Sequence, residues 1–351
     1  MKNKFFTIVL LFTICFSGLM LFSTSSEAAC SKNADGSILV KSGQAKPFAL
    51  TGTTTYDQDQ CSEEPDEYLI NFFRVAMCRE DPYTAGGQSA IDYATCTDLF
   101  VGDKSITLTP GEEFDLLDGD LAIPIGSYSY LVVITDNHLK IKHAQKYIDE
   151  NDDSLANIFG NASGDGAWCW TLASGITTYT GQTYDAGYAT GQGITPVASG
   201  GTTGTARLKC SDTKGTPAFA TEIIDHFGDD ATFVGFADYG VTGCGDCIDV
   251  ERDTGLTGIA IAGQMLQTDN TIATTEDNTR KMAFIYRYDV PTKIKESTIS
   301  FKLNITTYAS VSIDMAVTAD PDFQIFGAKV GGDPFIVQIK TKTRRSRGTW
   351  R

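Results

Sequence analysis

Short apolar runs bounded by turn-forming residues are the feature that most constrains the fold of this chain. The segment 68–78 is rich in aromatic residues and lies between prolines. In the segment 298–305, apolar and polar residues alternate strictly, as on a strand with one buried and one wet face. Such runs predict a β-sandwich or jelly-roll-like fold. Further strands are predicted at 121–135, 282–288, 308–314, 323–327 and 334–340.

Local signals between the runs predict one hairpin and few short helices. Asp136 and Asn137 are expected to form a turn, after which the segment 138–143 returns antiparallel to the strand before it. Short helices are expected at 222–227 and 259–266. No fixed-period repeat is visible, which argues against a solenoid or a propeller. The chain is therefore predicted to be mainly β.

The composition changes along the chain and predicts one or two domains. Gly, Thr, Ser, Ala and Tyr crowd the middle, which favours an insertion or a junction between domains. The apolar content of 42% is sufficient for a hydrophobic core. The predicted organisation is a signal peptide (1–28), an N-terminal β-sandwich domain (29–159), a Gly/Thr/Tyr-rich insertion or junction (160–206), a C-terminal β domain (207–339) and a basic tail (340–351).

The N-terminal segment predicts export. Lys2 and Lys4 precede an apolar run over residues 5–22, and small residues follow up to Ala28. This pattern is typical of a secretory signal peptide, so the mature chain is expected to be secreted, periplasmic or attached to the cell surface. The apolar run is just long enough to span a bilayer, and an uncleaved membrane anchor is the alternative.

Cysteine content supports an oxidising compartment. The chain has nine cysteines, and after Cys15 is removed with the leader an even number remains, which favours disulfides. The simplest pairing joins sequence neighbours. For Cys244 and Cys247, a redox or zinc-binding motif is an alternative, but their strand-like context favours a structural disulfide. The predicted pairs are Cys30–Cys61, Cys78–Cys96, Cys169–Cys210 and Cys244–Cys247.

Charge is distributed unevenly. The formal net charge is -16, from 44 acidic and 28 basic residues, which argues against a nucleic-acid partner. The tail 340–351 is cationic and contains no acid. We expect it either to contact another subunit or an anionic cell-surface polymer, or to be a solvated terminus. Membrane contact is expected only through an uncleaved leader. The candidate contact residues are Lys340, Lys342, Arg344, Arg345 and Arg347.

Aromatic residues in and near the central segment are candidates for ligand stacking. In carbohydrate-binding proteins, exposed Trp and Tyr rings provide apolar surfaces with a polar edge. The alternative is that these rings belong to the core, as aromatic residues of strand proteins commonly do. The candidate residues are Trp168, Trp170, Tyr179, Tyr184 and Tyr188.

Catalytic motifs are absent from the sequence. There is no zinc-protease motif, no nucleophile elbow and no phosphate-binding loop. Paired carboxylates occur throughout, and they leave a secreted hydrolase only as a third interpretation. No catalytic residue, no protein metal site and no cofactor is predicted. Calcium is the one ion considered, because the segments 33–36 and 161–166 begin like calcium loops, although both lack the final Glu.

One short segment resembles a known group of domains. The residues Pro124-Ile-Gly-Ser-Tyr-Ser-Tyr-Leu-Val-Val133 resemble the Pro-x-Gly-x-Tyr strand start of prealbumin-like and Cna-B-like β-sandwich modules of bacterial surface proteins. The resemblance covers about ten residues, the length of one turn and the strand after it. It implies a sandwich fold and a non-catalytic stalk or binding unit.

Together these features predict an exported, non-enzymatic structural β-protein of the cell surface or extracellular space, such as a fibre or layer subunit. A carbohydrate-binding module or lectin is the alternative.

Overall fold

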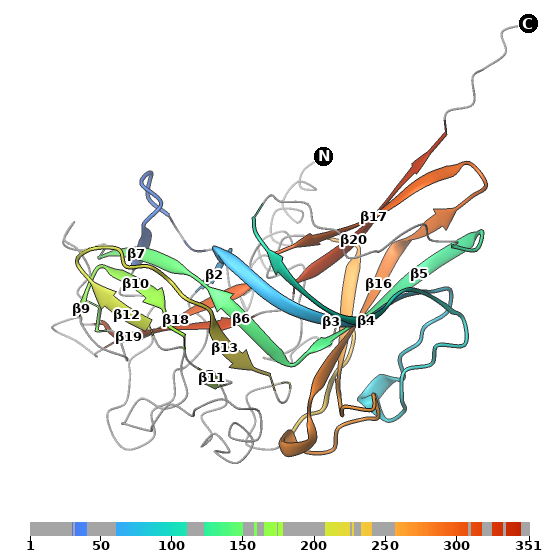
Figure 1. Ribbon diagram of the computed structural model, residues 1–351, viewed down its shortest axis with the longest axis horizontal. Coiled ribbons are helices and arrows are strands. Elements are labelled where there is room, and N and C mark those ends of the chain that lie inside the picture. The colour runs from blue at the N-terminus through green and yellow to red at the C-terminus, as the bar shows by residue number, and fades with distance from the viewer. Residues whose placement is uncertain are drawn as a thin grey trace, which may run out of the picture.

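The computed structural model describes residues 30, 32–40, 61–110, 123–149, 158–159, 165–173, 175–177, 208–224, 227, 233–240, 257–307, 310–317, 325–332 and 335–344. Within these ranges the protein is mainly β, with several antiparallel sheets in a sandwich-like arrangement (Figure 1), which confirms the predicted fold class. The helical elements of this part are short 3-10 turns, η1 (Ala85–Gly87) and η2 (Glu276–Asn278). The predicted signal peptide lies outside the described residues, as does most of the segment 160–206.

A nine-stranded sheet forms the centre of the described structure. Its order is β11-β13-β6-β3-β5-β16-β15-β14, and β4 pairs with β3. All of these pairings are antiparallel except that of β11 with β13. The strands are β3 (Glu67–Cys78), β4 (Cys96–Leu108), β5 (Gly126–Asp136), β6 (His138–Lys142), β11 (Gly175–Thr177), β13 (Ala220–Ile223), β14 (Phe236–Ala237), β15 (Ile259–Leu266) and β16 (Lys281–Ile294).

Smaller sheets surround the central one. The first contains β1 (Ile38–Val40), β7 (Ala144–Asp149), β10 (Trp168–Thr171) and β12 (Leu208–Ser211). A second contains β2 (Cys61–Glu63), β18 (Val311–Val317) and β19 (Ile325–Gly332). β17 (Thr298–Thr306) pairs with β20 (Ile336–Thr343), and β8 (Ile158–Phe159) pairs with β9 (Asp165–Gly166).

The predicted hairpin at residues 136–137 is wrong. β5 and β6 both pair with β3, so they follow one another along the same neighbour and do not fold back. Asn137 is buried between them. Its N–H donates to the carbonyl of Arg280, its carbonyl accepts from the N–H of Ile224, and its side-chain amide donates to the Ile224 carbonyl. Neighbouring segments satisfy the polar groups that a turn would have used locally.

Neither predicted helix is present where the structure describes its residues. The segment 259–266 is β15, which pairs with β14 and β16. Its residues 261–266 are all buried, so the alternation typical of a half-exposed strand is missing and the sequence is ambiguous. Residues 222 and 223, at the start of the other predicted helix, belong to β13.

The central sheet combines strands from both predicted domains. β5 lies in the segment 29–159 and β16 in the segment 207–339, and the two pair from Asp136↔Lys281 to Gly126↔Ile294. The predicted boundary between the segments therefore does not coincide with a boundary between sheets.

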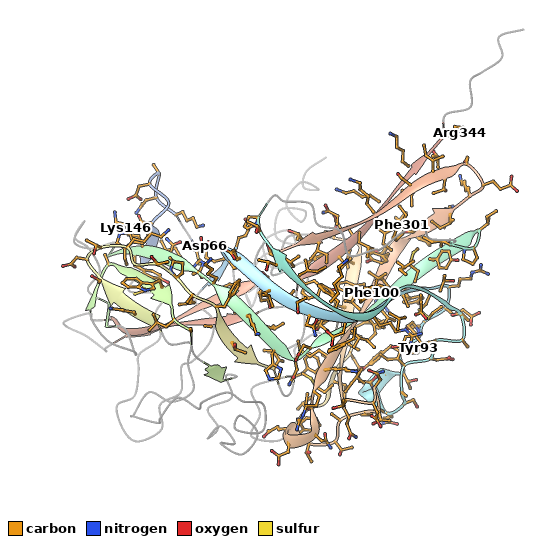
Figure 2. All side chains as sticks on the ribbon, viewed as in Figure 1. Asp66, Tyr93, Phe100, Lys146, Phe301 and Arg344 are labelled. Atoms are coloured by element: carbon orange, nitrogen blue, oxygen red, sulfur yellow. A yellow bond between two sulfur atoms is a disulfide. The ribbon has the colours of Figure 1, made fainter. Side chains whose placement is uncertain are left out.

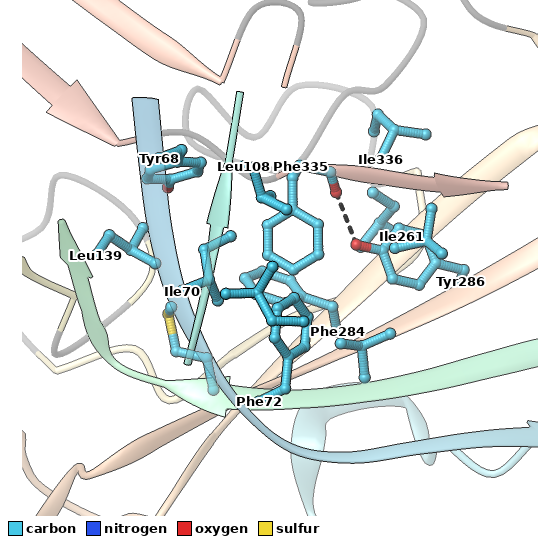
Figure 3. Packing of buried hydrophobic residues seen from close by; sticks show 14 of the residues in the cluster. Tyr68, Ile70, Phe72, Leu108, Leu139, Ile261, Phe284, Tyr286, Phe335 and Ile336 are labelled. Atoms are coloured by element: carbon cyan, nitrogen blue, oxygen red, sulfur yellow. Dashed lines mark hydrogen bonds between the residues drawn. The ribbon is translucent and has the colours of Figure 1, made fainter. Parts of the chain in front are cut away.

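Each face of the central sheet has its own hydrophobic cluster. On one face, Phe72 and Phe284 pack edge-on against Phe335, with ring centroids 5.9 and 5.6 Å away (Figure 3). The hydroxyl of Tyr286 donates to the Phe335 carbonyl over 2.7 Å and fixes the start of β20 there. On the other face, Val132 and its neighbours form the second cluster under the loop 79–95. The strand β20 and the loop 79–95 therefore lie on opposite sides of the central sheet (Figure 1).

Among the described residues, no helix has the length and apolar character needed to cross a membrane.

Candidate functional site

The paired strands β17 and β20 form a two-stranded ribbon with one apolar face. The side chains of Phe301, Leu303, Ile305 and Ile339 pack against the first hydrophobic cluster. Tyr288 adds a polar tie, because its hydroxyl donates to the Val337 carbonyl over 2.6 Å. This packing anchors the ribbon on the sheet and leaves its other face outward.

The outward face of the ribbon is polar and positively charged. Lys302 lies directly opposite Lys340 in the antiparallel register, and Lys342 lies one step along the same face. All three lysines are exposed. Like charges placed directly opposite each other disfavour strand pairing. We call this surface the cationic ribbon face; it comprises Ser300, Lys302, Asn304, Gln338, Lys340 and Lys342.

Further cations lie at the end of the ribbon. Lys293 and Lys295 are exposed near the turn that joins β16 to β17, together with one exposed acid, Glu296. Arg344 is also exposed. Its N–H donates to the carbonyl of Ser297 over 2.7 Å, which places it beside that turn. Among the candidate contact residues of the tail, Lys340, Lys342 and Arg344 are thus brought together with these cations. Arg345 and Arg347 lie outside the described residues.

On the opposite side of the sheet, the loop 79–95 is fastened at both ends and in the middle. The Cys78–Cys96 disulfide closes the loop at its base. Gln264 is buried in β15, and its amide donates to the carbonyls of Gly87 and Ser89 over 3.1 Å each. The loop is therefore held in a defined position over the sheet.

Two tyrosine–carboxylate pairs join this loop to the segment after β14. Tyr83 donates to the Asp238 carboxylate over 2.6 Å, and the same oxygen accepts from the N–H of Gly86 over 2.8 Å. Tyr239 donates to the Asp81 carboxylate over 3.0 Å. The two rings meet edge to face, with centroids 5.6 Å apart.

These tyrosines are donors and not bases. Burial first, and then the carboxylates they contact, raise the pKa of Tyr83 and of Tyr239 well above the ordinary value. Burial raises the pKa of Tyr93 to about 12. All three phenols therefore stay protonated at neutral pH, which suits a structural role.

Arginines near the loop are covered by aromatic rings. Arg74 forms a two-bond pair with Asp98, at 2.7 and 3.0 Å, and its guanidinium carbon lies 3.6 Å from the centroid of the Tyr93 ring. Arg287 lies 4.5 Å from the centroid of the Tyr239 ring. The carboxylates of the loop, by contrast, are exposed. We call this surface the acidic loop face; it comprises Glu80, Asp81 and Asp92.

One predicted disulfide is described at both of its ends. Cys78 and Cys96 form this bond, and they are the pair expected from joining sequence neighbours. Cys30 and Cys169 each take part in a disulfide. Cys169 lies directly opposite Cys210 in the pairing of β10 with β12. Cys61 lies in β2. The Cys30–Cys61 and Cys169–Cys210 pairs stay predictions, and Cys244 and Cys247 lie outside the described residues.

The candidate stacking aromatics divide between described and undescribed residues. Trp170 is buried, and Gly215 lies so close that an added Cβ would be 2.2 Å from the indole ring. This contact favours a packing role for Trp170. Trp168 is half-buried, with the Lys214 ammonium 5.4 Å from its ring centroid. Tyr179, Tyr184 and Tyr188 lie outside the described residues, so ligand stacking stays a prediction.

Within the described residues, no group of three or more His, Cys, Asp or Glu side chains is arranged to hold a metal ion. In the first segment considered for calcium, the Asp35 carboxylate accepts hydrogen bonds from Ser37 and from Lys146. The second segment lies mostly outside the described residues.

Sequence reasoning identified the basic tail but missed the acidic loop face and its tyrosine pairs. Their partners come from distant segments, and neither Asp81 nor Asp238 lies in a recognisable motif. The fold and these surfaces define a β-sandwich-like protein with oppositely charged outer surfaces. Comparisons with protein-family models, curated proteins and solved structures find no match for this chain.

Proposed function

We propose that this chain is an exported, non-enzymatic structural β-protein that associates with copies of itself at the cell surface or in the extracellular space, as a fibre or layer subunit. The observation that carries the proposal is the cationic ribbon face, where the exposed Lys340 and Lys342 continue into the exposed Arg344. A cluster of exposed like charges favours a partner of opposite charge.

Other features support a structural role. The described residues are mainly strands, and the Cys78–Cys96 disulfide is of a type common outside the reducing cytosol. The acidic body supplies a complementary charge for a cationic surface. The leader-like residues 1–28 support export.

The test is the assembly state of the protein without residues 1–28. We expect concentration-dependent oligomers in sedimentation velocity, and fibres or sheets in negative-stain electron microscopy. A single monomer boundary up to about 100 µM, which excludes even a weak dissociation constant, would contradict the proposal. Electron microscopy of the producing cell with an antibody to this chain then gives the location.

A carbohydrate-binding protein is the second candidate, favoured by the half-buried Trp168 with Lys214 beside its ring. For this candidate, a glycan panel should contain a ligand that raises the melting temperature of the protein, and Trp168→Ala should remove that rise. Trp170→Ala is not a suitable test, because Trp170 is buried and its loss would affect folding.

A further inference from the structure

We infer that the cationic ribbon face of one copy docks on the acidic loop face of another copy. The inference rests on the proposed function and assigns the surfaces through which self-association occurs.

The two faces are positioned by different hydrophobic clusters. The ribbon packs through Phe301 and Ile339 on the cluster that contains Tyr286. The loop 79–95 packs through Tyr83 and Tyr93 on the other cluster. Because neighbouring residues of β16 point to opposite faces of the sheet, ribbon, sheet and loop form three successive layers. Figure 2 shows Phe301 and Arg344 on one side of these strands and Tyr93 on the other.

The outer layers carry opposite charge. On the ribbon side, Lys340 and Lys342 are exposed, and Arg344 continues the positive surface. On the loop side, the Glu80, Asp81 and Asp92 carboxylates are exposed beside a single exposed cation of the loop, Arg79, so the loop remains net negative. Two such surfaces attract one another once they approach within a Debye length, about 8 Å at physiological ionic strength.

The placement of the faces determines the kind of assembly. A surface on one side of the molecule that binds a different surface on the opposite side gives a head-to-tail contact. Each added copy presents the same unfilled surfaces again, so the contact does not close into a two-fold dimer and continues as a chain or a ring. The occupant of the ribbon face is thus a second copy. A free anionic polymer is the competing occupant, and the test must distinguish it from a second copy.

The test uses two charge variants and a control. Lys340→Glu with Lys342→Glu inverts the ribbon face, and it should not impair folding, because Glu at position 340 lies opposite Lys302. Glu80→Lys with Asp92→Asn reduces the charge of the loop face. Asn at position 92 still accepts the hydrogen bond that Asp92 accepts from the Ala94 N–H. Lys140→Glu changes an exposed lysine on β6, away from both faces, and is the matched control.

Sedimentation velocity of the protein without residues 1–28 should show oligomers for the unaltered chain and the control, and their average size should fall at least twofold at 1 M NaCl. Each charge variant alone should be monomeric at concentrations where the unaltered chain assembles. An equimolar mixture of the two should recover complexes, because the intact ribbon face of one meets the intact loop face of the other. Circular dichroism should give all variants the same β spectrum.

The outcomes separate this inference from the proposed function. If the unaltered chain is monomeric throughout, the proposed function fails and the docking inference fails with it. If the unaltered chain assembles and both charge variants assemble equally well, the docking inference is overturned while self-association stands. If the ribbon variant still assembles but loses binding to polygalacturonate that the unaltered chain shows, the occupant of the ribbon face is an anionic polymer, which also overturns the inference.

Discussion

Tyr83 and Asp238 lie 155 positions apart in the sequence, yet the Tyr83 hydroxyl donates a hydrogen bond of 2.6 Å to the Asp238 carboxylate. The bond fastens the loop 79–95 to the segment that follows β14. It is charge-assisted and partly buried, and both properties increase the free energy lost when the donor is removed.

Tyr83→Phe should therefore lower the free energy of unfolding by about 2 kcal/mol, as expected for a hydrogen bond to a charged group. Tyr130→Phe is the matched control, because Tyr130 lies at the edge of the same cluster and its hydroxyl forms no hydrogen bond within the described residues. Urea denaturation followed by tryptophan fluorescence gives both values. Equal losses for the two variants would contradict the role assigned to Tyr83.

Gly87→Ala should destabilise the protein more than Gly240→Ala. Both glycines have positive φ, of +58° and +53°, so each substitution imposes a similar backbone strain of about 1 kcal/mol. At Gly87, however, the new Cβ would also lie 2.5 Å from the Phe236 Cβ, whereas nothing lies within 4 Å at Gly240. We expect an additional loss of about 2 kcal/mol at position 87, measured as the difference between the two unfolding free energies.

Removal of the Cys78–Cys96 disulfide by paired alanine substitutions should lower the free energy of unfolding by about 3 kcal/mol. The bond joins residues 18 positions apart, and the expected value follows from the chain entropy of a loop of this length. Hydrogen exchange should accelerate in the loop 79–95 and stay unchanged in the ribbon. A loss under about 1 kcal/mol would show that Gln264 and the tyrosine pairs hold the loop without the disulfide.

His143 should make the protein sensitive to mild acid. Its ring is buried, and neither ring nitrogen has a partner among the described residues. Burial, reinforced by Lys32 and Lys214, lowers its pKa to about 4 from the ordinary 6.5. The neutral ring is thus favoured by folding, so its contribution is present in full above pH 6.5 and is lost as the pH falls toward 4.

The measurement is the free energy of unfolding of the unaltered protein and of His143→Leu between pH 7.5 and 4.5. The unaltered protein should lose up to about 1.4 kcal/mol more per pH unit than the variant below pH 6. Parallel curves for the two proteins would contradict the prediction, because carboxylate titration is common to both.

The strands with clear local patterns could be predicted from the sequence. In β17, Phe301, Leu303 and Ile305 point to the core while Ser300, Lys302 and Asn304 point outward, so the alternation is visible directly. β15 gave no such signal, because both of its faces are buried and its Ala, Leu and Met residues also suit a helix.

The errors and omissions have a common physical origin. Asn137 favours turns by its local chemistry, but Arg280 and Ile224 satisfy its backbone instead, and only the tertiary fold brings them there. The tyrosine pairs of the loop depend in the same way on a segment roughly 150 residues distant. The charge of the tail was visible as composition, whereas the pairing of Lys302 with Lys340 required the register.

The pairing of β5 with β16 at the centre of the sheet has a consequence for how the chain reaches this state. The paired residues, such as Asp136 and Lys281, are about 150 positions apart, so a long loop must close before the sheet can form. The first half of the chain cannot complete its own core during synthesis. Formation of the complete central sheet should therefore be slow and should finish only after β16 is available, although β3, β4, β5 and β6 can pair earlier.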